Sequence, residues 1–215
     1  MSEQQISKLA GALVEHQRRF AALPTADAQW VIENTAAAIA LFVAAVANRA
    51  NGALVQAKKL LRFVTTVSVG ALENFVAADN YKVDTSRKAK VRIAWLGENF
   101  KKHLLGLSEG ACEAADLRVH ELLEQSVDAP IITELANRCE ITLGKHFVLL
   151  SKQGRGESGV LLTNGYANIA YIRDANGVLW AVNADWYAGY DGWGVEAFSV
   201  EDPCRWSDGY QFVSR

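Results

Sequence analysis

The residues best suited to contact another molecule lie in the last third of the chain. Tyrosine, aspartate, serine and glycine alternate there with large apolar residues. Tyrosine gives a large amphipathic contact at low entropic cost, while serine and glycine let a loop adapt. This composition predicts a binding face and not a reaction centre. The polar and glycine positions are Asp185, Tyr187, Tyr190, Asp191, Gly194, Ser207, Asp208 and Tyr210, and the apolar ones are Trp180, Val182, Trp186, Trp193, Val195, Val200, Trp206 and Val213.

Catalytic and metal-binding patterns are weak by comparison. A nucleophilic enzyme needs an activated side chain, a base and an orienting group. Cys139 lies two helical turns before His146 with no third partner evident, and such cysteines are more often small buried hydrophobes. The histidines show no zinc spacing, and the carboxylates after residue 184 match no calcium loop. We therefore expect no catalytic residue, metal or cofactor.

Composition indicates an ordinary globular protein. Half of the 215 residues are hydrophobic and 21% are charged, with a formal net charge of −2. A sequence pI near 6.1 argues against a dedicated nucleic-acid binder. Three cysteines at irregular spacing fit a reducing compartment. A basic group on the helix predicted around residues 87–102 could contact nucleic acid or an acidic partner, although a solvated helix face is the commoner explanation. Its members are Arg87, Lys88, Lys90, Arg92, Lys101 and Lys102.

The first residues do not resemble a signal peptide. The longest apolar run, residues 36–47, is far shorter than the roughly 20 residues that span a bilayer. We expect a cytoplasmic protein with no membrane span.

The last hundred residues resemble a known family. The run LWAVNADWYAGYDGWGVEAFSVEDPCRWSDGYQFVSR, with GVLLTNGYANIAYIRD before it, is similar to the variable region of the target proteins of diversity-generating retroelements. The tryptophan spacing and the terminal DGYQ and SR carry most of this resemblance, which covers roughly residues 117–215.

The resemblance implies a C-type-lectin-like fold for this region and a role for it in binding. In that family, adenine-directed mutagenesis rewrites asparagine codons and never produces tryptophan. A variable region over about residues 183–211 and a protein or cell-surface ligand are therefore expected. Glu196 is not reachable by adenine replacement and is left out. The implied ligand-binding residues are Asp185, Tyr187, Tyr190, Asp191, Gly194, Phe198, Asp202, Cys204, Ser207 and Tyr210.

The first half of the chain reads as helical. Helices are predicted from Ser2 to about Pro24, from Thr25 to Ala50, from Ala53 to Ala78, and from Ser86 to about Leu107. Short loops between amphipathic helices favour an antiparallel bundle over residues 1–109, which would serve docking or homo-oligomerisation.

The second half reads as α+β over residues 110–215. Residues 117–123 alternate as a strand, and helices are predicted from Asp128 through Leu135 and from Glu140 to Gln153. Ala175-Asn176-Gly177 is a strong hairpin turn because asparagine and glycine tolerate positive φ. The remaining predicted strands cover residues 160–162, 167–173, 178–185, 194–200 and 210–214.

Two other interpretations stay open. The C-terminal region could be a small-substrate enzyme with an aromatic-lined pocket, which a Cys, His or carboxylate pair in a deep pocket would favour. It could also be a structural protein whose tryptophans form only a core. An exposed surface of tyrosine and aspartate would favour binding.

Overall fold

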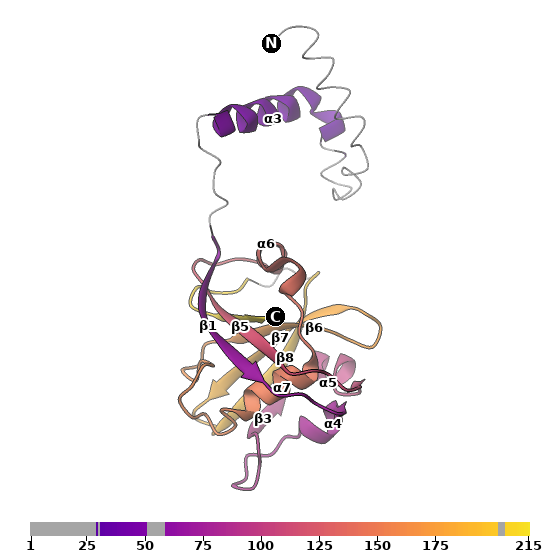
Figure 1. Cartoon of the computed structure of the whole chain (residues 1–215), viewed down its shortest axis with the longest axis vertical. Helices are drawn as coiled ribbons and strands as arrows, with labels where there is room; N and C mark the ends of the chain where they lie inside the picture. The colour runs from indigo at the N-terminus through magenta and orange to yellow at the C-terminus, as the bar shows by residue number, and fades with distance from the viewer. Residues whose placement is uncertain (1–28, 30, 51–58, 202–204) are drawn as a thin grey trace. The chain divides into compact units, whose positions relative to one another are not determined.

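The computed structural model describes residues 29, 31–50, 59–201 and 205–215. The chain divides into two compact units, Met1–Lys58 and Lys59–Arg215. The boundary therefore lies after Lys58, whereas we expected it after residue 109. Figure 1 shows the described elements of each unit.

In the first unit, the structure describes helix α3 (Thr35–Ala50). Alanine is the best helix former, and this helix is rich in it. The helix predicted over residues 25–50 is confirmed for the part described. The helix predicted over residues 2–24 lies outside the described residues. Among the helices that are described, none has the length and apolarity needed to cross a membrane.

The predicted N-terminal helical bundle is wrong. Strand β1 (Leu61–Val69) occupies part of the third expected helix, and strand β3 (Ile93–Leu96) lies within the fourth. The sequence of β1, LRFVTTVSV, is rich in β-branched residues, which favour strands because their side chains pack well on a pleated surface. Its apolar residues also fit helical spacing, so periodicity alone misidentified it.

The second unit is built on one mixed sheet of seven strands (Figure 1). The fold is thus a large mixed sheet that draws strands from both sides of residue 110, and not a helical bundle followed by a separate lectin-like domain. The β6–β9 and β3–β8 pairs are parallel and the others antiparallel. In spatial order the strands are β1, β5 (Ala115–Leu122), β9 (Gln211–Ser214), β6 (Asn168–Arg173), β7 (Leu179–Tyr187), β8 (Gly192–Ser199) and β3.

Most elements predicted after residue 110 are confirmed. These are strands β5 to β9 and helices α6 (Asp128–Leu135) and α7 (Leu143–Ser151). The hairpin turn between β6 and β7 is also confirmed, with Gly177 at a φ of 80°. The strand predicted over residues 160–162 is wrong. The buried side chain of Gln153 bonds both backbone groups of Leu161 and so takes the place of a neighbouring strand.

Each face of the sheet carries its own core. Helices α4 (Ala77–Asn80), α5 (Glu98–His103) and α7 pack on the first face. Helix α6 packs on the second and lies apart from those three (Figure 1). A 3-10 turn (Ala136–Arg138) follows α6, and a two-stranded ribbon joins β2 (Phe75–Val76) to β4 (Ser108–Glu109).

The four tryptophans that alternate with polar residues in the last third of the chain are all buried, and we call them the tryptophan frame. Trp193 is fully enclosed, and the exposed fractions of Trp180, Trp186 and Trp206 are 8%, 7% and 3%. Alternate residues of β7 belong to different cores: Val182 packs in the first and Ala181 in the second. The polar residues of β7 therefore all lie on the second face.

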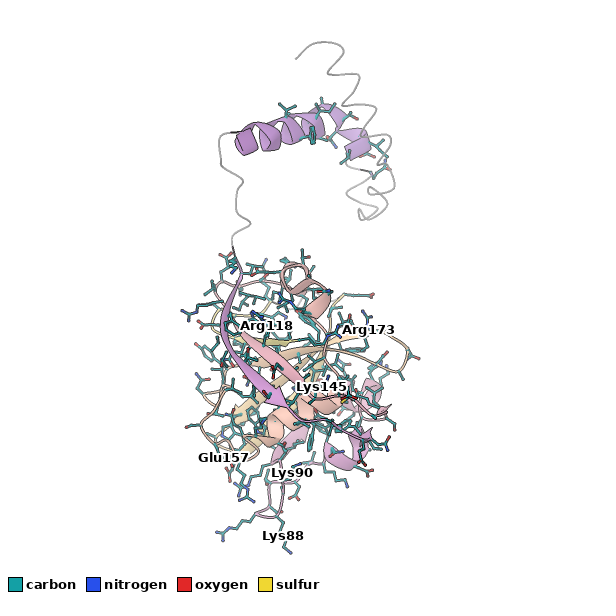
Figure 2. All side chains as sticks on the ribbon, viewed as in Figure 1. Lys88, Lys90, Arg118, Lys145, Glu157 and Arg173 are labelled. Carbon is teal, nitrogen blue, oxygen red and sulfur yellow. The ribbon has the colours of Figure 1, made fainter. Side chains whose placement is uncertain are left out.

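The basic group predicted along one helix face is not a continuous stripe. It is divided between the loop before β3 and helix α5. Lys88 and Lys90 lie at the lower end of the unit in Figure 2, and Arg118, Lys145 and Arg173 lie apart from them.

Candidate recognition surface

The second face of the sheet is polar and aromatic where it reaches β7, β8 and β3. Asp185 on β7 lies opposite Gly194 on β8, and Gly194 lies opposite Trp95 on β3. Directly paired residues share a face, and so do residues two apart on one strand. Asp185, Tyr187 and Trp95 therefore occupy the same side of the sheet.

Trp95 covers Gly194. A Cβ built on Gly194 would lie 2.4 Å from the Trp95 indole nitrogen, so only glycine lets the indole rest directly on β8. The Trp95 and Tyr187 ring centroids are 6.1 Å apart, with the rings tilted by 57°. Tyr190, in the β7–β8 turn, continues the row 6.4 Å from Tyr187. We call Trp95, Tyr187 and Tyr190 the aromatic edge.

Asp185 is a half-buried carboxylate at the base of this edge. Its Oδ2 accepts a hydrogen bond from the Asn183 side-chain amide at 2.9 Å, whereas its Oδ1 is buried and accepts none from the residues that the structure describes. Burial raises the pKa of Asp185 to about 6, and the Asn183 hydrogen bond opposes that rise. The pKa of Tyr187 is also raised, first by burial and then by the nearby Asp185 and Tyr210.

A second loop meets the same region. Tyr210 lies just before β9. The centroid of its ring is 5.7 Å from that of Tyr166 and 6.5 Å from that of Trp206. Because Tyr210 also contributes to the raised pKa of Tyr187, the loop before β9 and the end of β7 are electrostatic neighbours. Ser207 is half-buried in this loop, and Gly209 turns the chain with a φ of 82°.

Trp206 anchors this second loop to the sheet. Its indole N–H donates to Asp128 Oδ1 at 2.7 Å, and the buried Tyr171 hydroxyl donates to the same oxygen at 2.7 Å. Asp128 is 1% exposed and begins α6. Burial raises the pKa of Asp128, while the two hydrogen bonds oppose the rise. The loop thus has a fixed, hydrogen-bonded base beneath its exposed residues.

The surface tyrosines differ from the buried ones in their hydroxyl groups. Buried Tyr81 bonds His146 Nδ1 at 2.7 Å, and Tyr171 bonds Asp128. Within the described part of the chain, no protein group bonds the hydroxyls of the surface tyrosines. Buried tyrosine hydroxyls usually bond a protein group, as those of Tyr81 and Tyr171 do. The hydroxyls of the surface tyrosines can instead bond water or a ligand. The surface tyrosines are Tyr166, Tyr187, Tyr190 and Tyr210, with Tyr190 71% exposed.

Asp191 is the last residue of the β7–β8 turn, and its backbone and carboxylate are both constrained. Its φ is 49°, a left-handed conformation that aspartate tolerates better than most residues. Its carboxylate forms an ion pair with Arg92, which precedes β3. The ion pair ties the turn to the edge strand, and Asp191 itself stays exposed.

The structure brings together most of the described residues implied by the resemblance, but gives three of them supporting roles. Tyr210 is half-buried and packs against the second core beside Trp206, while its hydroxyl stays unbonded within the described residues. Gly194 is buried under Trp95 and presents no side chain. Phe198 is half-buried and packs edge-to-face on Trp206, 5.4 Å away, so it lines the second core. Asp202 and Cys204 lie outside the described residues.

Sequence reasoning missed three members of this surface: Trp95, Tyr166 and Glu196. Trp95 and Tyr166 fall outside the stretch that carries the variable positions. Glu196 was left out because its codon cannot arise by adenine replacement. The alternation of Gly192, Gly194 and Glu196 along β8 is the signal that would have placed Glu196 on this face.

The pairings considered for catalysis are not formed. Cys139 belongs to the second core, whereas His146 is buried on α7 beside the first and bonds Tyr81. Burial lowers the pKa of His146 to about 4 and raises that of Cys139. Among the described residues, no three His, Cys, Asp or Glu side chains gather where they could hold a metal ion.

The chain matches none of the protein-family models, curated proteins or solved structures with which it was compared. The role of this surface therefore has to be argued from its own geometry.

Proposed function

We propose that residues 59–215 bind a ligand without transforming it, through the side chains on the β7–β8 turn and the loop before β9. The ligand is a protein or a cell-surface molecule. As in the retroelement target proteins that the last hundred residues resemble, the contact residues are the ones that vary.

One observation carries this proposal: the tryptophan side chains are buried inside the fold, whereas the contact tyrosines reach the surface with hydroxyls that no described protein group bonds. The tryptophan frame is buried, and Trp193 and Trp206 each donate a hydrogen bond, to Gln153 O at 3.0 Å and to Asp128. The surface tyrosine hydroxyls bond nothing within the described chain. The exposed members, Tyr166, Tyr187 and Tyr190, can be exchanged at little cost in stability, since surface substitutions usually change the free energy of unfolding by less than about 0.5 kcal/mol.

The geometry also suits recognition energetically. A few aromatic anchors dominate the affinity of many interfaces, and tyrosine is enriched among them. Four tyrosines and one tryptophan lie on the same surface as the half-buried Asp185, on a base fixed by β-sheet hydrogen bonds and by Asp128. A rigid base lowers the entropy lost on binding.

A pair of display libraries tests this difference between surface and buried residues. One library randomises the exposed residues Tyr166, Tyr187, Tyr190 and Asp191 together. The control library randomises four buried residues of the first core: Trp193, Val195, Ala197 and Val213. We expect most members of the first library to fold, and selection against one purified protein to yield specific binders. We expect the control library to fold rarely. Equal loss of folding in both libraries, or a well-folded first library that yields no binders, would refute the proposal.

The DNA that flanks the gene provides an independent test of whether a retroelement diversifies the surface. Sequencing the flanking DNA should find a reverse-transcriptase gene and a near-copy of the segment encoding residues 183–211, differing mainly at adenines. A locus with neither feature would exclude retroelement diversification.

A further inference from the structure

The aromatic edge and Asp185 together resemble a receptor for positive charge, and this inference rests on the proposed function. Trp95 and Tyr187 present π-faces, which attract cations within about 6 Å of the ring centroid. The two rings are tilted by 57° and not stacked flat, so they do not cover each other. A third group can therefore contact both.

The charge beneath these rings is unbalanced. Asp185 has no lysine, arginine or histidine partner among the residues described. Arg92, which precedes β3, is already paired with Asp191. Glu196, on the neighbouring strand, adds a second carboxylate to the same face. A cation that settles on the aromatic edge would therefore meet uncompensated negative charge.

The burial of Asp185 distinguishes a cation from a sugar. Tryptophan beside aspartate and asparagine also suits a carbohydrate, but a sugar needs directional hydrogen bonds to accessible polar atoms. Here the Asn183 amide already donates to Asp185, and Asp185 Oδ1 is covered from solvent. Coulomb attraction needs no direct contact and is stronger through a layer of protein than through water.

We infer that the aromatic edge binds an arginine side chain of a protein ligand, with the guanidinium against Trp95 and Tyr187 and its charge balanced by Asp185. Arginine suits this site better than lysine because its planar, weakly hydrated guanidinium stacks on aromatic rings. The site would thus give a diversified surface one constant preference, for basic protein segments.

The test uses the full-length chain and two peptides that differ in charge alone. Acetyl-Gly-Arg-Gly-amide is compared with its citrulline counterpart, in which a neutral urea replaces the guanidinium. Binding is followed through the indole N–H signals in ¹H–¹⁵N spectra, with Trp95 assigned from the Trp95→Phe variant. We expect a saturable shift of the Trp95 signal and roughly five- to tenfold tighter binding of the arginine peptide. A methyl glycoside should leave the signal unchanged.

Two matched variants test whether the negative charge of Asp185 causes the preference for arginine. Asp185→Asn should remove the preference for arginine over citrulline. Asp79→Asn, which makes the same change on α4 over the first face of the sheet, should retain it. Equal binding of both peptides, an unaffected preference in Asp185→Asn, or a sugar-induced shift would overturn the inference. Library binders to neutral targets would still support the proposed function in that case, so the two failures are distinguishable.

Discussion

Replacing Asp128 by alanine should destabilise the second unit more than any surface change. One carboxylate oxygen accepts hydrogen bonds from both Tyr171 and Trp206, whose side chains are 0% and 3% exposed. Each buried donor left without an acceptor costs about 1–3 kcal/mol. Removal of a buried, desolvated charge offsets part of that loss. We expect a net decrease of about 2–4 kcal/mol in the free energy of unfolding.

Chemical denaturation followed by tryptophan fluorescence measures this loss, because five of the six tryptophans lie after residue 59. The melting temperature should fall by roughly 5–15 °C for a unit of this size. Asp79→Ala is the control, since Asp79 is exposed and should cost less than about 0.5 kcal/mol.

A double-mutant cycle separates the hydrogen bond from other effects of Asp128. In the Asp128→Ala background, Tyr171→Phe removes the orphaned hydroxyl, so it should cost at least about 1 kcal/mol less than in the parent chain. If Tyr171→Phe costs the same in both backgrounds, or if Asp128→Ala costs less than about 1 kcal/mol, the hydrogen-bond argument is wrong.

Three further predictions concern His146, Gly194 and Glu109. His146 is neutral in the fold with a pKa of about 4, so the unfolded chain binds its proton first and stability falls as pH drops from 6.5 towards 4. The free energy of unfolding, measured with urea at pH 7 and pH 4.5, should fall by about 2–3 kcal/mol less in His146→Gln than in the parent chain; equal losses would refute this. Gly194→Ala should shift the NMR signal of the Trp95 indole N–H and lower the free energy of unfolding by about 1–3 kcal/mol, because the added methyl meets the indole. Gly189→Ala should do neither, because a Cβ at that position meets no other atom within 4 Å. Glu109→Gln should cost about 1 kcal/mol in urea unfolding, because the carboxylate accepts two backbone N–H bonds at the start of α7, and an unchanged midpoint would contradict this.

The later elements could be predicted because their signals are local. The Asn176-Gly177 turn fixes the β6–β7 hairpin, and alternation in β7 separates Trp180 and Val182 from Asp185 and Tyr187. Similar local cues placed α6 and α7. These features depend on nearest neighbours in the sequence, and so sequence reasoning found them.

The earlier strands could not be predicted because distant partners decide them. Residues Leu61–Val69 fit helical and strand spacing equally, and the pairing with Ala115–Leu122 selects the strand. The same holds for the site. Tyr187, Tyr190 and Tyr210 were predicted from composition, but Trp95 joins them only through the parallel pairing of β3 with β8, which no local pattern reveals.

The place of β9 in the sheet bears on how the protein is made. Gln211–Ser214 lies between β5 and β6 and supplies all the pairing between β1–β5 on one side and β6–β7–β8–β3 on the other. Yet β9 is the last of these strands to leave the ribosome. Without this short strand the chain can form at most two separate half-sheets, each with an unpaired edge, so the complete sheet requires β9. The proposed contact residues all precede β9 in the sequence, so the surface that they form is completed only when β9 pairs with both half-sheets.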